Sequence, residues 1–178
     1  GGDAASLAPG RHRVWSASPE QFFRSGGDRI RPRPMKGTAP RGRWLAEDDE
    51  IAARLIGSAK DRAENAMIVD LLRNDLGRIR RPGSVEVERM FEAERYETVW
   101  QLTSTIEGDL RPGTTLLEAF RALFPSGSVT GAPKVRTMRI IADLEDSARG
   151  PYCGAIGYLA PSGSGEPRGS FNVAIRTV

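Results

Sequence analysis

The stretch KDRAENAMIVDLLRNDLGRI, residues 60–79, says more about the fold than any other part of this chain. Its apolar residues recur every three or four positions, which predicts an amphipathic helix over 60–75. The residues on that face are Glu64, Met67, Ile68, Leu71 and Asp75. A buried carboxylate such as Glu64 must be protonated, paired with a cation or bound to a metal. A Glu–Arg pair and a metal ligand are both open interpretations of Glu64.

Patterns on both sides of this helix predict further elements. Helices are expected over 48–57, 115–124 and 133–145, the last with Pro133 at its first position. Strands are expected over 12–18, 84–91, 153–160 and 170–178.

The last of these strands carries an arginine near the end of the chain. Alternation puts Phe171, Val173 and Ile175 on one face and Asn172, Ala174 and Arg176 on the other. We expect the first face to be buried and Arg176 to be presented on the second. Because the chain enters a strand almost at once and stops just after Arg176, we expect residues 1–178 to be one partial domain of a longer protein.

Lysine is rare here, with three lysines against 23 arginines, and each lies in a dense motif: Lys36, Lys60 and Lys134. A buried lysine can lose its proton and act as a nucleophile or base, whereas an arginine stays charged. The lysines are therefore candidates for chemistry, with packing or a salt bridge as the alternative.

Two glycine-bearing loops are suited to anions. The segment FPSGSVTGAPKVR, residues 124–136, runs into a predicted helix N-terminus, although an ordinary loop-to-helix junction looks similar. The segment PMKGTAPRGR, residues 34–43, adds Arg41 and Arg43 for carboxylate contacts. Together with Lys36 and Glu64 they suggest a small polycarboxylate substrate. A magnesium ion at Glu64 would need a second carboxylate or substrate oxygens.

Composition excludes several classes of protein. The hydrophobic fraction of 39% and the charged fraction of 28% are typical of a globular domain. No apolar run suits a membrane span or a signal peptide, so we expect a cytoplasmic protein with no membrane partner. The single Cys153 excludes an internal disulfide. Arginine-rich segments at 29–33 and 78–81 leave nucleic-acid binding as an alternative, but they lack interleaved aromatic residues.

Six motifs in order resemble the chorismate-utilising enzymes, and the resemblance covers residues 12–178. The motifs are SASPEQF (16–22), PRPMKGTAPRG (32–42), KDRAENAMIVDLLRNDLGRI (60–79), RYETVWQLTSTIEGDL (95–110), FPSGSVTGAPKVRTMRII (124–141) and RGPYCGAIGYL (149–159). Within that family, lysine before Gly37-Thr38 and the YCG around Cys153 resemble component I of the aminodeoxychorismate synthases. Anthranilate synthases typically have alanine at the lysine position, and component I of an anthranilate synthase or another chorismate-transforming enzyme remains the alternative.

The resemblance implies a fold and a function. The fold would be α+β, a layered sandwich of two packed sheets with outer helices. The function would be amination of chorismate to 4-amino-4-deoxychorismate, towards p-aminobenzoate and folate, with ammonia from a glutamine amidotransferase subunit or fused domain. The intact protein would be a transferase, whereas residues 1–178 alone would not catalyse.

The resemblance also implies roles for particular residues. Lys36 would be the nucleophile, Glu20 the general acid and base, and Glu64 a ligand of Mg2+. Substrate contacts would come from Gly37, Thr38, Gly127, Ser128, Tyr152 and Arg176.

The chain departs from the family pattern at three positions. Gln101 replaces a frequent histidine, Met35 replaces isoleucine, and Ser170 replaces a frequent aspartate. The only histidine, His12, lies outside every motif. The family also continues beyond this chain, into a glycine-rich loop and a helix with a further magnesium-binding glutamate.

Overall fold

A computed structural model describes residues 4–7, 13–161 and 168–178, so His12 lies outside the described part of the chain. The α+β class is confirmed, because helices pack against sheets whose strand pairs are all antiparallel. In chain order the elements are β1 (Ala5–Leu7), β2 (Val14–Ser16), β3 (Gln21–Gly26), β4 (Arg29–Pro32), β5 (Met35–Pro40), α1 (Leu45–Gly57), α2 (Ala59–Leu76), β6 (Glu86–Arg95), β7 (Val99–Asp109), α3 (Leu116–Leu123), α4 (Gly127–Thr130), α5 (Lys134–Leu144), β8 (Ala155–Ala160) and β9 (Arg168–Val173).

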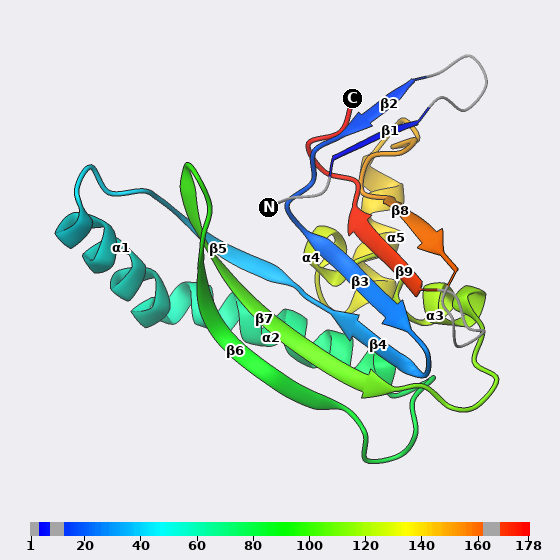
Figure 1. Ribbon diagram of the computed structural model, residues 1–178. Helices are drawn as coiled ribbons and strands as arrows, with labels where there is room; N and C mark the ends of the chain where they lie inside the picture. The colour runs from blue at the N-terminus through cyan, green and yellow to red at the C-terminus, as the bar shows by residue number, and fades with distance from the viewer. Residues whose placement is uncertain (1–3, 8–12, 162–167) are drawn as a thin grey trace.

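The larger sheet has seven strands and divides into two arms (Figure 1). Strands β4 and β5 follow one another along β7, since Ile30 pairs with Gly108 and Thr38 pairs with Gln101. Strand β4 also pairs with β3, which continues to β9 and β8. Beyond Pro32 the two sets of strands diverge, and β5, β6 and β7 form a long arm while β3, β8 and β9 form a short arm. The remaining pair, β1 and β2, forms a separate two-stranded sheet.

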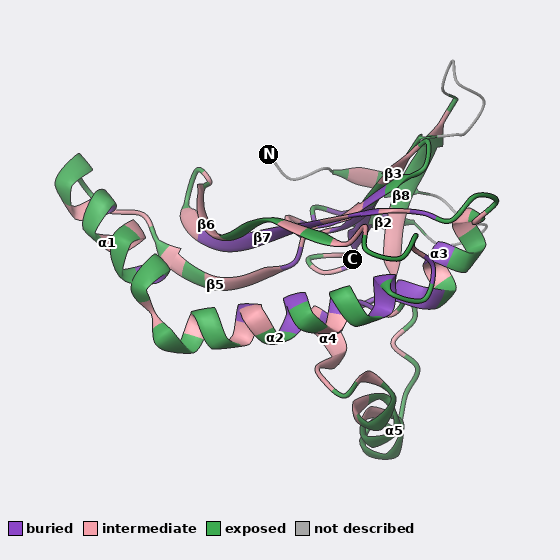
Figure 2. Ribbon diagram, turned by 90° about the horizontal axis from the view of Figure 1, so that it is seen from below, coloured by how far each residue is buried: buried purple, intermediate pink, exposed green. Residues whose placement is uncertain are grey.

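Helix α2 lies along one face of the sheet and supplies much of the core (Figure 2). Its buried apolar residues are Ile68, Val69, Leu72 and Leu76. Strands contribute Phe23, Ile30 and Ile106, all fully buried. Phe120 of α3 completes the core with edge-to-face contacts to Phe23 and Phe171, at centroid distances of 5.1 and 4.8 Å. Burial of these side chains holds the helix layer against both arms.

The predicted helices are confirmed to within a few residues at each end. Pro133 is the residue before α5 rather than its first residue. Among the predicted strands, 153–160 and 84–91 correspond to β8 and β6, whereas 12–18 is shortened to Val14–Ser16. Strands β1, β3, β4, β5 and β7 and the short helix α4 were not predicted. Prolines and arginines obscure alternation in β3, β4 and β5, and β7 is buried on both faces despite several hydroxyl side chains.

The expected strand over 170–178 ends early, at Val173. The Ile175 amide donates to the Val173 carbonyl at 2.8 Å, and Arg176 has a φ of 49°, so the chain turns instead of continuing. The expectation that Asn172 and Ala174 lie on an open face is wrong, because both are buried. The Asn172 side chain satisfies its amide by donating to the Ser18 carbonyl.

In the part of the chain that the structure describes, no helix combines the length and the apolar character needed to cross a bilayer.

Candidate active site

Several residues of the sequence motifs meet where the two arms of the sheet separate. Lys36 lies on β5 at the start of the long arm, and Glu20 precedes β3 of the short arm. A bulge in the β5–β7 pairing between Met35 and Thr38 redirects the strand at Lys36. The Lys36 Nζ donates a hydrogen bond to the Ser128 carbonyl at 3.1 Å, which joins β5 to α4.

Glu20 is buried beside these groups, with only 5% of its surface exposed. Burial raises the pKa of Glu20 above its ordinary value, while the Ser128 hydroxyl and the charges of Lys36 and Arg176 act in the opposite direction. A carboxyl group in this setting can hold a proton and release it, as a general acid and base requires.

Arg176 reaches this cluster from a turn rather than from a strand. Its carbonyl accepts from the Ala17 amide at 3.2 Å, and Thr177 bridges to Ser16 of β2. The backbone therefore holds Arg176 close enough to Glu20 for its charge to affect the Glu20 carboxyl.

Gly127 and Ser128 lie in a segment that packs tightly on α2. A Cβ at Gly127 would come within 2.5 Å of the Leu71 Cδ2, so a larger residue could not take this place without movement. The Ser126 and Ser128 hydroxyls lie 2.9 Å apart. The glycine thus lets Ser128 approach both Lys36 and Glu20.

Gly37 and Thr38 follow the lysine on β5. Gly37 has a φ of 97°, a region that favours glycine, and a Cβ at this position would lie 3.1 Å from the Cβ atoms of Asp61 and Leu102. The Thr38 hydroxyl donates to the Gln101 Oε1 at 2.8 Å. Gln101 is buried at the position where the family pattern has histidine, and this hydrogen bond orients its amide oxygen towards Thr38.

Glu64 lies differently from the sequence expectation. Its side chain is 45% exposed and its one ion pair among the described residues is with Lys60 at 4.0 Å. The buried face of α2 is centred on Asn65, Ile68 and Leu72. The predicted face was therefore rotated about the helix axis relative to the observed one, and Glu64 lies at the edge of the buried face. A buried Glu–Arg pair at Glu64 is excluded.

A magnesium ion is the cofactor that the family resemblance implies, and the residues partly fit it. Within residues 4–7, 13–161 and 168–178, no group of three or more acidic, histidine or cysteine side chains could enclose a metal ion. Magnesium usually keeps several waters and takes only one or two protein carboxylates. The half-exposed Glu64 carboxylate is free to provide one such ligand.

Tyr152 lies apart from the Lys36 cluster. It is exposed and lines a cavity of about 300 Å3 between α5 and the turn before β8, together with Phe124, Met138 and Arg149. No described contact joins Tyr152 to Lys36 or Glu20.

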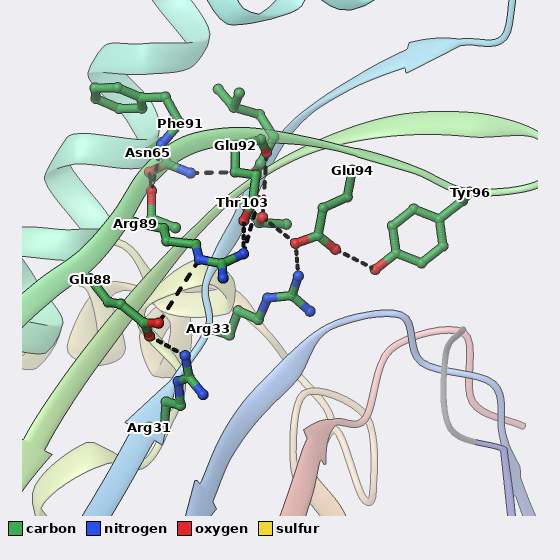
Figure 3. A network of polar contacts seen from close by, with 12 residues as sticks. Arg31, Arg33, Asn65, Glu88, Arg89, Phe91, Glu92, Glu94, Tyr96 and Thr103 are labelled. Atoms are coloured by element: carbon green, nitrogen blue, oxygen red, sulfur yellow. Dashed lines mark hydrogen bonds and ion pairs between the residues drawn. The ribbon is translucent and has the colours of Figure 1, made fainter.

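Four arginines of the two arginine-rich segments form ion pairs with acidic residues. Arg31 and Arg33 form ion pairs with Glu88 and Glu94 across the face of the sheet (Figure 3). Arg29 and Arg81 likewise pair with acidic residues, namely Glu107, Asp109 and Asp28. Paired in this way, these arginines do not favour the nucleic-acid alternative.

Sequence reasoning missed the buried contacts of Asn65, and it gave a salt bridge as the alternative for Lys134 without naming Asp75 as the partner. Asn65 accepts from the Ser104 hydroxyl at 2.6 Å and donates to the Leu102 carbonyl at 3.4 Å, tying α2 to β7 (Figure 3). Lys134 pairs with Asp75. A polar residue on the apolar face of a predicted helix was the available signal for both.

Comparisons with known proteins agree on one family. The model of the chorismate binding enzymes matches residues 3–178. An aminodeoxychorismate synthase of Streptomyces pristinaespiralis is 50% identical over 93% of this chain and 22% of that protein. An anthranilate synthase component 1 of Aeropyrum pernix is 48% identical over 86% of this chain and 35% of that protein.

A solved structure has the same fold. Anthranilate synthase component I from Streptococcus pneumoniae superposes with a TM-score of 0.85 and 38% identity, over 98% of this chain and 37% of that one. The chain thus spans between about a fifth and somewhat over a third of the length of these relatives.

Proposed function

Because this chain belongs to the chorismate binding enzymes, we propose that the intact protein aminates chorismate to 4-amino-4-deoxychorismate. The relatives include both aminodeoxychorismate and anthranilate synthases, so the choice between reactions depends on the site. The observation that carries it is Lys36, whose amine donates to the Ser128 carbonyl and whose charge acts on the buried Glu20. A nucleophile next to a proton donor suits displacement of a ring hydroxyl.

In the first step the neutral Lys36 amine forms a bond to the chorismate ring and the bond from C4 to its hydroxyl breaks. Protonated Glu20 gives its proton to the leaving hydroxyl, which departs as water. The raised pKa of Glu20 favours the protonated form that this step needs. The result is a covalent adduct on Lys36 and a Glu20 carboxylate.

In the second step ammonia attacks C4 and the bond to Lys36 breaks, returning its electron pair to the amine. The new ammonium group gives a proton to Glu20, which restores the starting state. The sum is chorismate plus ammonia giving 4-amino-4-deoxychorismate plus water. Ammonia would come from a glutamine amidotransferase, as a separate subunit or a fused domain.

Binding of the substrate would use the charges and hydrogen bonds around the cluster. Arg176 would grip a carboxylate, and Ser128, Gly127, Gly37 and Thr38 would form the walls near the ring. Tyr152 would contact substrate from the neighbouring cavity. Magnesium, held by Glu64 and by groups outside the described residues, would neutralise a ring carboxylate.

The identity of the product tests the proposal. The intact protein is incubated with chorismate, Mg2+ and ammonium, and the products are separated and identified by mass. We expect 4-amino-4-deoxychorismate. Anthranilate as the main product would establish the alternative that the anthranilate synthase relatives support. Unchanged chorismate would refute both.

A further inference from the structure

Lys134 is the third lysine singled out by the sequence, and its contacts are internal. Its Nζ donates to the Asp75 Oδ2 at 2.5 Å and to the Leu123 carbonyl at 2.7 Å. The side chains of Lys134 and Asp75 are 11% and 3% exposed. One ammonium group therefore connects the start of α5, the end of α3 and the last turn of α2.

These contacts close a loop. Leu123 and Lys134 flank residues 124–133, and the bond between them joins the two ends of that loop. Asp75 then fixes the joined ends to α2, the same helix whose Leu71 packs against Gly127 inside the loop. The loop is thus attached to α2 at two points about one helical turn apart.

Little else holds α5 in the described structure. None of its residues is buried, and Figure 2 shows the helix standing away from the sheet. The Lys134 contacts therefore tie this helix to the ends of α2 and α3 through one nearly buried ammonium group. Without them the base of the loop could open.

The loop carries Ser128, which contacts both reacting groups of the proposed mechanism. Its carbonyl accepts from Lys36, and its hydroxyl acts on Glu20. A displacement of about 1 Å at such a site costs on the order of a hundredfold in rate. Any movement at the base of the loop would be transmitted to this contact.

We propose that Lys134 and Asp75 are positioning residues, which hold the loop over residues 124–133 so that Ser128 meets Lys36 and Glu20. The positioning of the loop does not depend on the proposed function; only the expected loss of activity rests on it. Lys134 does no chemistry itself, because two of its three N–H bonds are used by protein groups in a nearly closed site.

The test compares this ion pair with a matched one elsewhere. Arg41 and Asp48 form an ion pair at 2.5 Å on the long arm, with Asp48 5% exposed, and neither residue touches the loop. Lys134→Met and Asp75→Asn remove the first pair, and Asp48→Asn removes the second. Lys134→Arg is a milder change that keeps the charge. Each is made in the intact protein.

Two readouts are measured in all variants: hydrogen exchange of the amides of residues 126–131, and kcat/KM with chorismate. We expect Lys134→Met and Asp75→Asn to speed exchange by about tenfold or more and to lower kcat/KM by roughly ten- to a hundredfold. Lys134→Arg should show smaller changes in the same direction. Asp48→Asn should leave the exchange rate and kcat/KM within about twofold of the parent values, although it should lower the free energy of unfolding.

Equal loop exchange in the Lys134→Met and Asp48→Asn proteins would refute the proposal. If Lys134→Met does not fold, the Lys134→Arg variant takes its place. Loop exchange and kcat/KM equal to the parent values in that variant would also refute the proposal. Hydrogen exchange is measured without substrate, so it tests the positioning of the loop even if the parent protein does not convert chorismate. That failure would overturn the proposed function alone, and the exchange rates of residues 126–131 would still support or refute this inference.

Discussion

The Lys36 amine and the Ser128 carbonyl lie 3.1 Å apart, although 92 positions separate them in the chain. This hydrogen bond links the strand that carries the proposed nucleophile to the loop that borders Glu20. It also fixes where the amine points in the free protein. The two residues therefore define the centre of the candidate site.

Lys36→Ala should abolish the covalent adduct with chorismate, which is detected as a mass increase of the intact protein. Amination should fall by at least about 10³-fold, because no other described lysine approaches Glu20. Lys60→Ala is the matched control, since the Lys60 side chain is 83% exposed and its one ion-pair partner among the described residues is Glu64. An adduct that persists in Lys36→Ala would mean that another group is the nucleophile.

Glu20→Gln should change stability in a direction that depends on pH. The folded state binds the Glu20 proton more tightly than the unfolded state, because burial raises its pKa above 4.5. The stability from this group is therefore present at pH below 4.5 and lost as pH rises through the folded pKa. At pH 7–8 the neutral variant should gain roughly 0.5–2 kcal/mol while losing activity.

Urea unfolding from pH 4 to pH 8 checks this prediction, with Glu118→Gln as a control of opposite sign. Glu118 caps α3 through the Thr115 amide and hydroxyl, which lower its pKa. Its contribution to stability is lost as pH falls, so its replacement should destabilise at neutral pH. A Glu20→Gln protein that is less stable than its parent at pH 8 would contradict our account of Glu20.

Glu64→Gln should weaken the dependence of chorismate binding on magnesium, because it keeps the shape of the side chain and removes its charge. We expect the Mg2+ concentration for half-maximal binding to rise on the order of tenfold or more. Asp70→Asn, which alters an exposed carboxylate on the same helix, should have no such effect. An unchanged magnesium titration in Glu64→Gln would exclude Glu64 as a ligand.

Gly127→Ala should destabilise the protein by about 1–3 kcal/mol, because its Cβ would overlap the Leu71 Cδ2. The strain should also displace Ser128 and raise KM for chorismate. Gly57→Ala is the control, since a Cβ there meets nothing within 4 Å. Thermal unfolding measures both variants, and equal midpoints would show that α2 and the loop adjust to each other freely.

The amino-acid sequence by itself determined four of the five helices in the described residues, the family and most of the residues that gather at the site. Helix α2 was predictable because its periodicity is a local property of residues 59–76. Lys36, Glu20 and Ser128 could be named because they lie in ordered motifs, and Arg176 because it ends the alternating segment 170–178. None of these inferences required knowing which segments are neighbours in space.

Only the tertiary structure decided how the carboxylates and lysines are paired. Glu64 and Asp75 share a predicted face, yet Glu64 is half-exposed and Asp75 is buried against Lys134, 59 positions away. The end of β9 at Val173 and the divergence of the two arms were equally hidden. Such features arise from contacts between segments that are distant in the sequence, and the burial and hydrogen bonds of those contacts outweigh local propensity. Strand alternation and helical spacing therefore cannot predict them.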